Sequence, residues 1–502
     1  MGTAVEVLER QGLADVETRL REYLPRQRWF GGRDREIMSL RVVDVGVILE
    51  GDPSIWSVVL EVDYVVGDPE RFHVPIAFAT EGARDVWEGI IVGTGEREGR
   101  PVVAYDALHG GEASFAFWRA TAAGTDIPME HGRLNCRNLG FELGIEGPGA
   151  VRPLGREQSN SSLVRGDLEV MKCFRKLAGG TSPELEMLEA LAAQGFRAVA
   201  APLGVMEYQD DAGVTALVAM LQPYLHNGTD GWTLALASLR DLYGHVEDMG
   251  VDERRDAARV VRERGASFEP ESERIARVTA RMHLALRRAE DPDMRPVPAG
   301  PEVLGRWQAE MREDLDRLLA GDSEALEPLR ARRGRVDEAF VAVGDLAHGG
   351  MSIRYHGDYH LGQLLRTDRG WTVLDFEGEP ARGPETRRAR SSGLRDVAGM
   401  MRSFDYAAEV ELRNWAEPGE GDYQLVRDFG LAWARVNRES FWDAYIDEIG
   451  ESDVIPRGGD AGALCRAFAM QKAVYEAGYE LGHRPDWLDI PLNFLLGESA
   501  DD

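Results

Sequence analysis

The chain has 502 residues, of which 43% are hydrophobic and 29% charged, a composition that is typical of folded globular proteins and excludes wholesale disorder. At about 100–200 residues per domain, this length predicts two to four domains. The 87 acidic residues outnumber the 58 basic ones, and the resulting net charge of −29 repels nucleic-acid phosphates and anionic lipid. We therefore expect neither a nucleic-acid nor a membrane partner.

The sequence shows no signal for membrane insertion or export. No stretch reaches the roughly 18 apolar residues of a membrane-spanning helix, and no signal-peptide layout opens the sequence. The three cysteines, Cys136, Cys173 and Cys465, lie far apart and form no metal-binding pattern. A reducing compartment suits them best, so we expect a cytoplasmic protein.

The predicted elements, taken in chain order, fall into a β-rich first part and a helical second part. Leucine and valine at three- or four-residue steps predict an amphipathic helix over the first ~25 residues. Val- and Ile-rich stretches bounded by Gly, Asp or Pro predict strands at 40–49, 56–66 and 72–79, and further short strands up to residue 176. A helix at 183–193 and a strand at 215–221 follow. After residue 225 the period is helical, at 232–243, 253–264, 272–288 and 302–319, with a β interruption at 363–376.

This order predicts an α+β protein with three parts. We expect an N-terminal β-rich cap domain at residues 1–100 and a β-rich lobe with one helix at 101–222. A large helical lobe at 223–502 would carry the β-hairpin. The sequence contains no internal repeat and no low-complexity linker between these parts.

The strongest chemical signal is the stretch 355–363, Tyr-His-Gly-Asp-Tyr-His-Leu-Gly-Gln, with an aspartate twelve residues after its end. Asp358, an amide side chain at Gln363, a hairpin and then Asp375 have the layout of a phosphotransferase catalytic loop. In that chemistry a carboxylate accepts the proton of the attacking hydroxyl group, which is the role predicted for Asp358. Gln363 and Asp375 are predicted to hold Mg²⁺ against the phosphates.

Two other interpretations of this stretch stay open. His356, Asp358 and His360 alternate along the chain and could ligate a metal ion in a hydrolase. Polar residues in a short motif can also do no more than close a turn. The longer spacing to Asp375 favours the phosphotransferase interpretation.

Lysine is scarce in this chain: Lys172, Lys176 and Lys472 stand against 55 arginines. Because nearly all the cationic residues of this chain are arginines, a lysine indicates a site that needs a compact ammonium group. Lys172 lies in the middle of a predicted strand, and its rarity favours a role on the phosphates over simple exposure to solvent. Glu186 in the following helix is its predicted ion-pair partner, because alanines share that helical face.

The other nucleotide contacts are predicted around this strand. A polar turn at 155–164 would let Ser159, Asn160 and Ser161 cover the phosphates, although it has neither a G-x-G-x-x-G nor a Walker pattern. Met220 and Gln222, where the strands give way to helices, are predicted at an adenine-binding hinge.

Longer stretches make the chain similar to the bacterial maltokinases, of the aminoglycoside-phosphotransferase-like branch of the protein-kinase-like superfamily. The resemblance covers nearly the whole chain. It implies an N-terminal cap domain followed by a bilobal protein-kinase-like fold with a large helical C-lobe. The stretches that carry it are 24–32, 157–162, 220–222, 230–232, 238–243, 355–363, 375–382, 394–407, 472–480 and 484–487.

The resemblance also implies an activity. It is the ATP-dependent phosphorylation of maltose at the anomeric hydroxyl, which gives maltose 1-phosphate for α-glucan (glycogen) synthesis. ATP and Mg²⁺ would be the cofactors. An enzyme of the trehalose or maltose pathway is a candidate partner, and we expect a monomer or a weak dimer.

The sugar contacts are the least defined part of the sequence. Tyr475 and Tyr479 lie four residues apart, hence on one helical face with Trp487 nearby, and they either contact the sugar or pack in the core. Arg395 and Asp396 are predicted to form a buried ion pair that anchors the catalytic loop. Further candidate sugar contacts are His360, Glu379, Arg402 and Asp405.

Three functions therefore stay open. The first is a maltose kinase, favoured by the match of 375–380 to the maltose-specific family. The second is a kinase for another hydroxylated acceptor such as glucosamine or an aminoglycoside, since a cationic acceptor suits an acidic chain. The third is a catalytically silent scaffold that binds a glucan-pathway enzyme through the cap, which the presence of Lys172, Asp358 and Asp375 disfavours.

Overall fold

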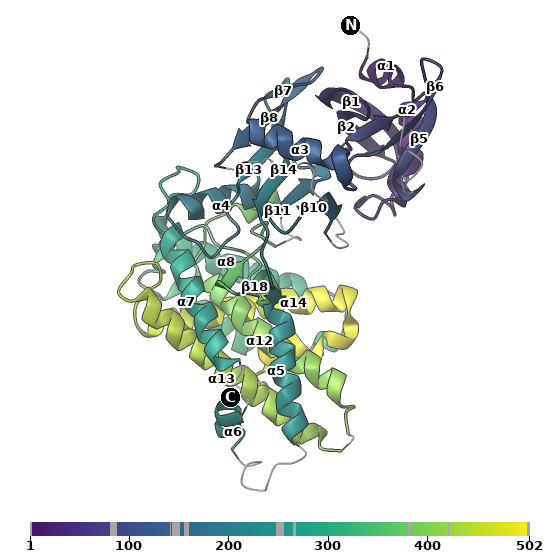
Figure 1. Cartoon of the computed structure of the whole chain (residues 1–502). Helices are drawn as coiled ribbons and strands as arrows, with labels where there is room; N and C mark the ends of the chain where they lie inside the picture. The colour runs from purple at the N-terminus through teal and green to yellow at the C-terminus, as the bar shows by residue number, and fades with distance from the viewer. Residues whose placement is uncertain are drawn as a thin grey trace. The chain divides into compact units, whose positions relative to one another are not determined.

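The structure is a computed structural model that describes residues 3–80, 88–140, 142, 151–154, 160–246, 256–264, 268–379, 383–419 and 421–498. The chain divides into two compact units (Figure 1). Unit 1 comprises Met1–Glu186 and Ala200–His226, and unit 2 comprises Met187–Val199 and Asn227–Asp502. Strands dominate the first unit and helices the second, which confirms the predicted α+β class.

Unit 1 opens with two short helices on an antiparallel sheet. The predicted N-terminal helix is two helices, α1 (Ala4–Glu9) and α2 (Val16–Tyr23), because Gly12 between them adopts a φ of +100° that no helix contains. Their apolar side chains share one core with the sheet. The sheet has the order β12-β3-β2-β4-β6-β5, with β1 paired to β2. The strands are β1 (Ile37–Leu49), β2 (Ser54–Tyr64), β3 (Glu70–His73), β4 (Ile76–Ala79), β5 (Ile91–Arg97), β6 (Arg100–Asp106) and β12 (Lys176–Leu177).

A second antiparallel sheet completes unit 1, in the order β7-β8-β13-β14-β11-β10-β9. Helix α3 (Gly111–Ala123) packs on β8, β9 and β13, at a place where the sequence predicts only strands (Figure 1). Burial of Phe115, Phe117 and Trp118 along with their neighbours leaves the middle of this helix without the polar face that marks a surface helix. The strands are β7 (Ile127–Pro128), β8 (Gly132–Asn138), β9 (Val151–Pro153), β10 (Asn160–Arg165), β11 (Glu169–Phe174), β13 (Gly204–Asp210) and β14 (Thr215–Pro223).

A buried ion pair joins the two sheets of unit 1. Arg175 follows β11 and Asp106 ends β6; their side chains are fully buried, with 2.9 Å between Nη2 and Oδ2. The Tyr23 hydroxyl also donates to Asp106, at 2.9 Å. Directly after Arg175, β12 pairs with β3 of the first sheet. The first sheet thus includes β6, which begins at residue 100, and β12, so a cut at residue 100 does not separate the two sheets. The domain divisions at residues 100 and 222 stay predictions.

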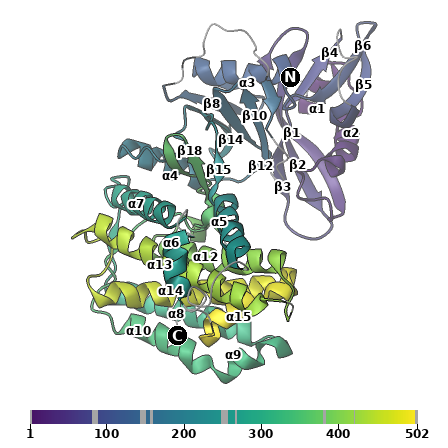
Figure 2. The ribbon, with the colours of Figure 1, turned by 60° about the horizontal axis from the view of Figure 1, so that its bottom comes forward.

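Unit 2 is built from helices around α12, which packs against α5, α13 and α14 (Figure 2). The predicted hairpin is confirmed as β18 (Leu364–Thr367) and β19 (Gly370–Val373), to which β15 (Thr229–Asp230) adds a third strand; β16 (Val297–Pro298) pairs with β17 (Met351–Ser352). Helix α4 (Pro183–Ala193) contains the boundary between the units. The other helices are α5 (Gly231–Val246), α6 (Ala257–Arg264), α7 (Glu269–Leu286), α8 (Pro301–Leu319), α9 (Glu327–Ala331), α10 (Arg333–Gly344), α11 (Pro384–Arg387), α12 (Leu394–Trp415), α13 (Tyr423–Ile449), α14 (Gly459–His483) and α15 (Asp489–Leu496).

Within the described ranges, no helix combines the length and the apolar composition that crossing a membrane requires. The three cysteines are buried, and none of them is in a disulfide.

Candidate active site

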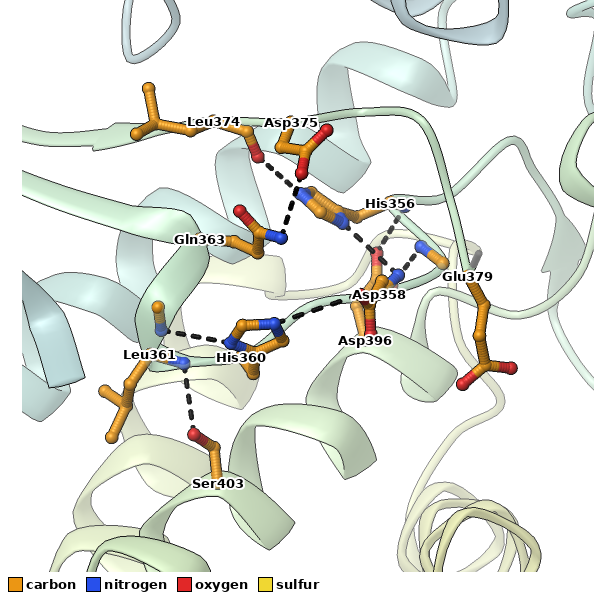
Figure 3. A network of polar contacts seen from close by, with 12 residues as sticks. His356, Asp358, His360, Leu361, Gln363, Leu374, Asp375, Glu379, Asp396 and Ser403 are labelled. Carbon is orange, nitrogen blue, oxygen red and sulfur yellow. Dashed lines mark hydrogen bonds and ion pairs between the residues drawn. The ribbon is translucent and has the colours of Figure 1, made fainter. Parts of the chain in front are cut away.

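The residues of the predicted catalytic loop gather at one end of the hairpin in unit 2 (Figure 3). Gln363 comes directly before β18, and Asp375 follows β19 by two residues. The two strands pair Leu364 with Val373, so that the flanking side chains come within hydrogen-bond distance, 3.2 Å from Gln363 Nε2 to Asp375 Oδ2. The spacing of amide, hairpin and carboxylate in the sequence thus becomes an amide and a carboxylate in hydrogen-bond contact.

The backbone at Asp375 is held in a strained conformation. Its φ of +61° lies in the left-handed region, which costs a residue with a side chain about 1–3 kcal/mol. The preceding residue, Leu374, is held on both sides of its backbone. Its N–H donates to the Gln363 carbonyl at 2.9 Å, and its own carbonyl accepts from His356 Nε2 at 2.8 Å. These bonds hold the chain in place, so the Asp375 side chain is directed by the surrounding fold.

Asp396 anchors the catalytic loop, but not as half of an ion pair with Arg395. Its buried carboxylate accepts the backbone N–H groups of His356 at 2.8 Å and Gly357 at 3.0 Å, and it lies 3.1 Å from His283 Nε2. The guanidinium of Arg395 pairs instead with Glu310 on α8, at 3.0 Å. The prediction of an Arg395–Asp396 pair is wrong, because adjacent helical residues point in different directions.

The two histidines of the loop use their ring nitrogens for hydrogen bonds to backbone groups at the loop. This argues against a metal cluster of His356, Asp358 and His360. His356 bonds Leu374 through Nε2, and its Nδ1 accepts the Asp358 N–H at 3.3 Å. His360 accepts the Gly362 N–H on Nδ1 at 3.0 Å, so in the neutral ring the proton sits on Nε2, 3.9 Å from Asp358 Oδ2. Burial lowers the pKa of His360, which favours that neutral ring.

Lys172 occupies the middle of β11 in unit 1, and its ammonium group forms an ion pair. The partner is Glu184 in the first turn of α4, at 2.8 Å, and not the predicted Glu186. Glu184 shares a helical stripe with Leu188 and Leu191, which are buried, whereas Glu186 is only partly buried. The α4 side chain that meets the lysine is therefore the buried carboxylate of Glu184 in its first turn.

The other predicted nucleotide residues lie on strands of unit 1. Asn160 and Ser161 belong to β10 rather than to a turn, and the Ser161 hydroxyl accepts from Arg175 Nε at 2.8 Å. Met220 is buried in β14 opposite Lys172, and Gln222 Nε2 donates to the Ala200 carbonyl at 2.6 Å. Ser159 lies outside the described residues.

A pocket of about 500 Å³ opens beside Asp358, within unit 2. Its walls come from the catalytic loop, from α5, α12 and α14, and from the segment after α14. Such a volume and an aromatic lining with a few polar groups suit a small polar ligand. The aromatic side chains of the wall are Trp232, Tyr359, Tyr406, Tyr475, Tyr479 and Trp487.

The predicted sugar contacts divide into two sets. His360, Tyr475 and Tyr479 line the pocket. Glu379, Arg402 and Asp405 lie outside its lining, and Figure 3 shows Glu379 directed away from Gln363 and Asp375. Two of these three residues form ion pairs with residues that do line the pocket. Glu379 pairs with Lys472 at 2.6 Å, and Arg402 pairs with Glu476 at 2.9 Å.

Apart from Asp358, sequence reasoning did not assign the charged residues of this pocket to the site; they are Lys472, Glu476, Glu480 and Arg484. The lysine count marks Lys472 as unusual, and no comparable signal marks the other three. Burial lowers the pKa of Lys472, but the carboxylates of Glu379, Asp358 and Glu476 outweigh burial and hold the pKa above its usual value. Burial also raises the pKa of Glu476, against the opposing effect of Arg402.

Comparison with known protein families finds two matches along the chain. Residues 23–109 match the maltokinase N-terminal cap domain, and residues 150–378 match the phosphotransferase enzyme family. Both matches fit the expected order of a cap followed by a kinase-like fold.

Two curated relatives are called glucosamine kinase. The protein from Streptacidiphilus jiangxiensis is 30% identical over 353 residues, covering 69% of this chain and 73% of the relative. The protein from Mycolicibacterium smegmatis is 30% identical over 354 residues, covering 70% of this chain and 80% of the relative. A solved structure of a glucosamine kinase in complex with glucosamine, ADP and inorganic phosphate covers 98% of this chain and 97% of that one, with a TM-score of 0.65 and 24% identity. At that identity the last match speaks for the fold alone.

Proposed function

Because the chain belongs to the phosphotransferase enzyme family, in the form that carries a maltokinase N-terminal cap domain, we propose that it is a sugar kinase that transfers a phosphoryl group from ATP to a sugar hydroxyl. The observation that carries this proposal is the position of Asp358. Its carboxylate lies in the wall of the aromatic pocket, on the same loop that leads to Gln363 and Asp375.

Asp358 acts as the general base. A hydroxyl group bound in the pocket donates its proton to the carboxylate while its oxygen attacks the phosphorus atom in line with the leaving group. Asp396 positions the base by holding the two backbone N–H groups that precede it. Because phosphoryl transfer depends mainly on positioning and charge, this fixed loop is a large part of the catalytic machinery.

Lys172 supplies a compact cation for the nucleotide phosphates, oriented by its bond to Glu184. Gln363 and Asp375 would hold Mg²⁺. The fit rests on the donor set, since an amide and a carboxylate side by side offer the oxygen ligands that Mg²⁺ prefers. When bound, the ion would neutralise charge on the phosphates.

We propose glucosamine as the acceptor. Three carboxylates line the pocket, those of Asp358, Glu476 and Glu480, against the ammonium group of Lys472 and the guanidinium group of Arg484. That balance favours a sugar with an ammonium group over a neutral sugar. The two relatives named glucosamine kinase support the same acceptor.

Maltose is the second candidate, supported by the cap domain at residues 23–109. Its product would be maltose 1-phosphate for glycogen synthesis. Association with a trehalose- or maltose-pathway enzyme and a monomeric or weakly dimeric state stay predictions, as does a cytoplasmic location.

The test is ATP consumption by the purified protein with glucosamine, maltose, glucose and kanamycin, at equal concentration and with Mg²⁺. We expect the highest kcat/KM for glucosamine, and NMR of the product would identify the phosphorylated carbon. A preference for maltose would establish the second candidate. Failure of all four acceptors to stimulate ATP turnover would contradict the sugar-kinase proposal.

A further inference from the structure

A second pocket in unit 2 carries a concentration of arginine that is unusual for this acidic chain. It lies among α10, α12, α13, α14 and α15, has a volume of about 570 Å³, and shares no lining residue with the pocket beside Asp358. Pockets of about 300–1,000 Å³ are the common size for small ligands. Its charged lining consists of Arg335, Arg402, Arg435, Arg438 and Arg466 with Asp405 and Glu439.

The two carboxylates are already engaged by arginine. Asp405 accepts from Arg402 at 2.8 Å and also bonds Arg438. Glu439 pairs with Arg262 on α6 at 2.9 Å and lies 3.9 Å from Arg435. Five guanidinium groups line the pocket with these two carboxylates, and Arg402 also bonds Glu476 outside the lining, so the wall carries more guanidinium groups than carboxylates. An anion that enters this pocket would therefore meet an attractive potential, although the chain as a whole repels it.

The guanidinium groups offer more than charge. Arg402 and Arg438 are buried, and their bonds to Asp405 hold their planar forks in place, whereas Arg435 is partly buried and Arg466 is exposed. Among the described residues, Arg466 has no ion-pair partner. Fixed guanidinium forks bind phosphate oxygens through paired hydrogen bonds, which a lysine cannot match.

The rest of the wall is apolar. Trp442, Met401 and Met470 line the pocket, and Phe494 lies under the Arg402 guanidinium, with 4.3 Å from Cζ to the ring centroid. A bare inorganic ion would leave this apolar surface uncovered. A phosphate group attached to a compact organic body, such as a sugar, would use both the arginines and the apolar wall.

Arg402 connects this pocket to the acceptor pocket. It is 2% exposed, and its Nε and Nη2 atoms donate to Glu476 Oε2 at 3.0 and 2.9 Å, while Nη1 donates to Asp405. Glu476 lines the acceptor pocket. A phosphate that draws the Arg402 guanidinium toward itself would weaken its hold on Glu476 and change the charge that the acceptor meets.

We propose that the arginine-lined pocket binds a small phosphate-bearing organic molecule, and that this binding changes the affinity for the acceptor through Arg402 and Glu476. By linkage, the acceptor then changes the affinity for the phosphate compound by the same factor. The coupling half rests on the proposed sugar-kinase function, whereas the binding half does not.

Binding is tested by titration calorimetry on the full chain without ATP or acceptor, using glucose 6-phosphate, its uncharged counterpart glucose, and inorganic phosphate. We expect glucose 6-phosphate to bind more tightly than either of the others, and more weakly as salt is added. The double variant Arg435→Ala/Arg466→Ala should weaken it by about tenfold or more, since a hydrogen bond to a charged group typically contributes at least that factor. The control Arg306→Ala/Arg312→Ala removes the same charge from exposed positions of α8 and should leave the affinity unchanged.

Coupling is tested by the acceptor KM with and without glucose 6-phosphate. We expect the compound to shift this KM in the wild type and in the α8 control, and not in Arg435→Ala/Arg466→Ala. No measurable binding, or binding of equal strength in both double variants, would overturn the site. Binding with an unchanged KM would overturn the coupling alone, and an inactive wild type that still binds the compound would count against the proposed function, not against the site.

Discussion

Replacing Lys472 by methionine removes an ammonium group that the structure places between two carboxylates. Its Nζ lies 2.6 Å from Glu379 Oε1 and 3.8 Å from Asp358 Oδ1. The Glu379 side chain is 6% exposed, so its charge would lose this partner in a buried environment. Removing one partner of a buried ion pair costs about 3–5 kcal/mol; since the Lys472 side chain keeps 27% exposure, we expect about 3 kcal/mol.

Urea titration of the purified variants measures this loss as a change in the free energy of unfolding. The matched control is Lys176→Met, whose lysine is 58% exposed and pairs with Glu70 at 2.9 Å, and which should cost less than about 1 kcal/mol. Adding Glu379→Gln to Lys472→Met removes the buried charge, so the double variant should recover about 2 kcal/mol. A double variant that is no more stable than Lys472→Met would refute the argument that the loss comes from removing the Lys472 partner of the buried Glu379 carboxylate.

Activity separates the two contacts of Lys472. The double variant should stay about 10²-fold below the wild type in turnover, because the ammonium group beside Asp358 in the acceptor pocket is still missing. Recovery of full turnover together with stability would remove Lys472 from the acceptor site and leave it a purely structural role.

The remaining predictions concern the residues assigned from the sequence. Asp358→Asn should lower kcat by about 10²–10⁴-fold with nucleotide affinity kept, and near-normal turnover would exclude it as the base. Asp375→Ala should raise the Mg²⁺ concentration needed for half-maximal activity, and an unchanged Mg²⁺ titration would show that another residue is the ligand. Steady-state kinetics should show a loss of about 10²-fold in turnover for Lys172→Arg and little loss for Lys176→Arg. Equal activity of the two variants would contradict the inference of a phosphate role for Lys172 from the scarcity of lysine.

The catalytic hairpin could be predicted because all of its parts lie within one short stretch of chain. Asp358, Gln363 and Asp375 are positioned by local spacing, and antiparallel pairing of two adjacent strands brings the ends of such a stretch together whatever surrounds it. The composition added Lys172, since a rare residue type stands out in any context. The α+β class also follows from local patterns, apart from α3, where burial on all sides hides the helical period.

The tertiary structure decided the contacts between distant segments. Lys472 contacts Glu379, 93 residues away in the sequence, and Arg402 contacts Glu476, 74 residues away. No sequence pattern predicts either pair. Even the partner of Lys172, only 12 residues away, depends on which face of α4 is buried. A helix offers charged side chains in every direction, and the one that forms the ion pair is chosen by the elements that pack against it, which local sequence does not contain.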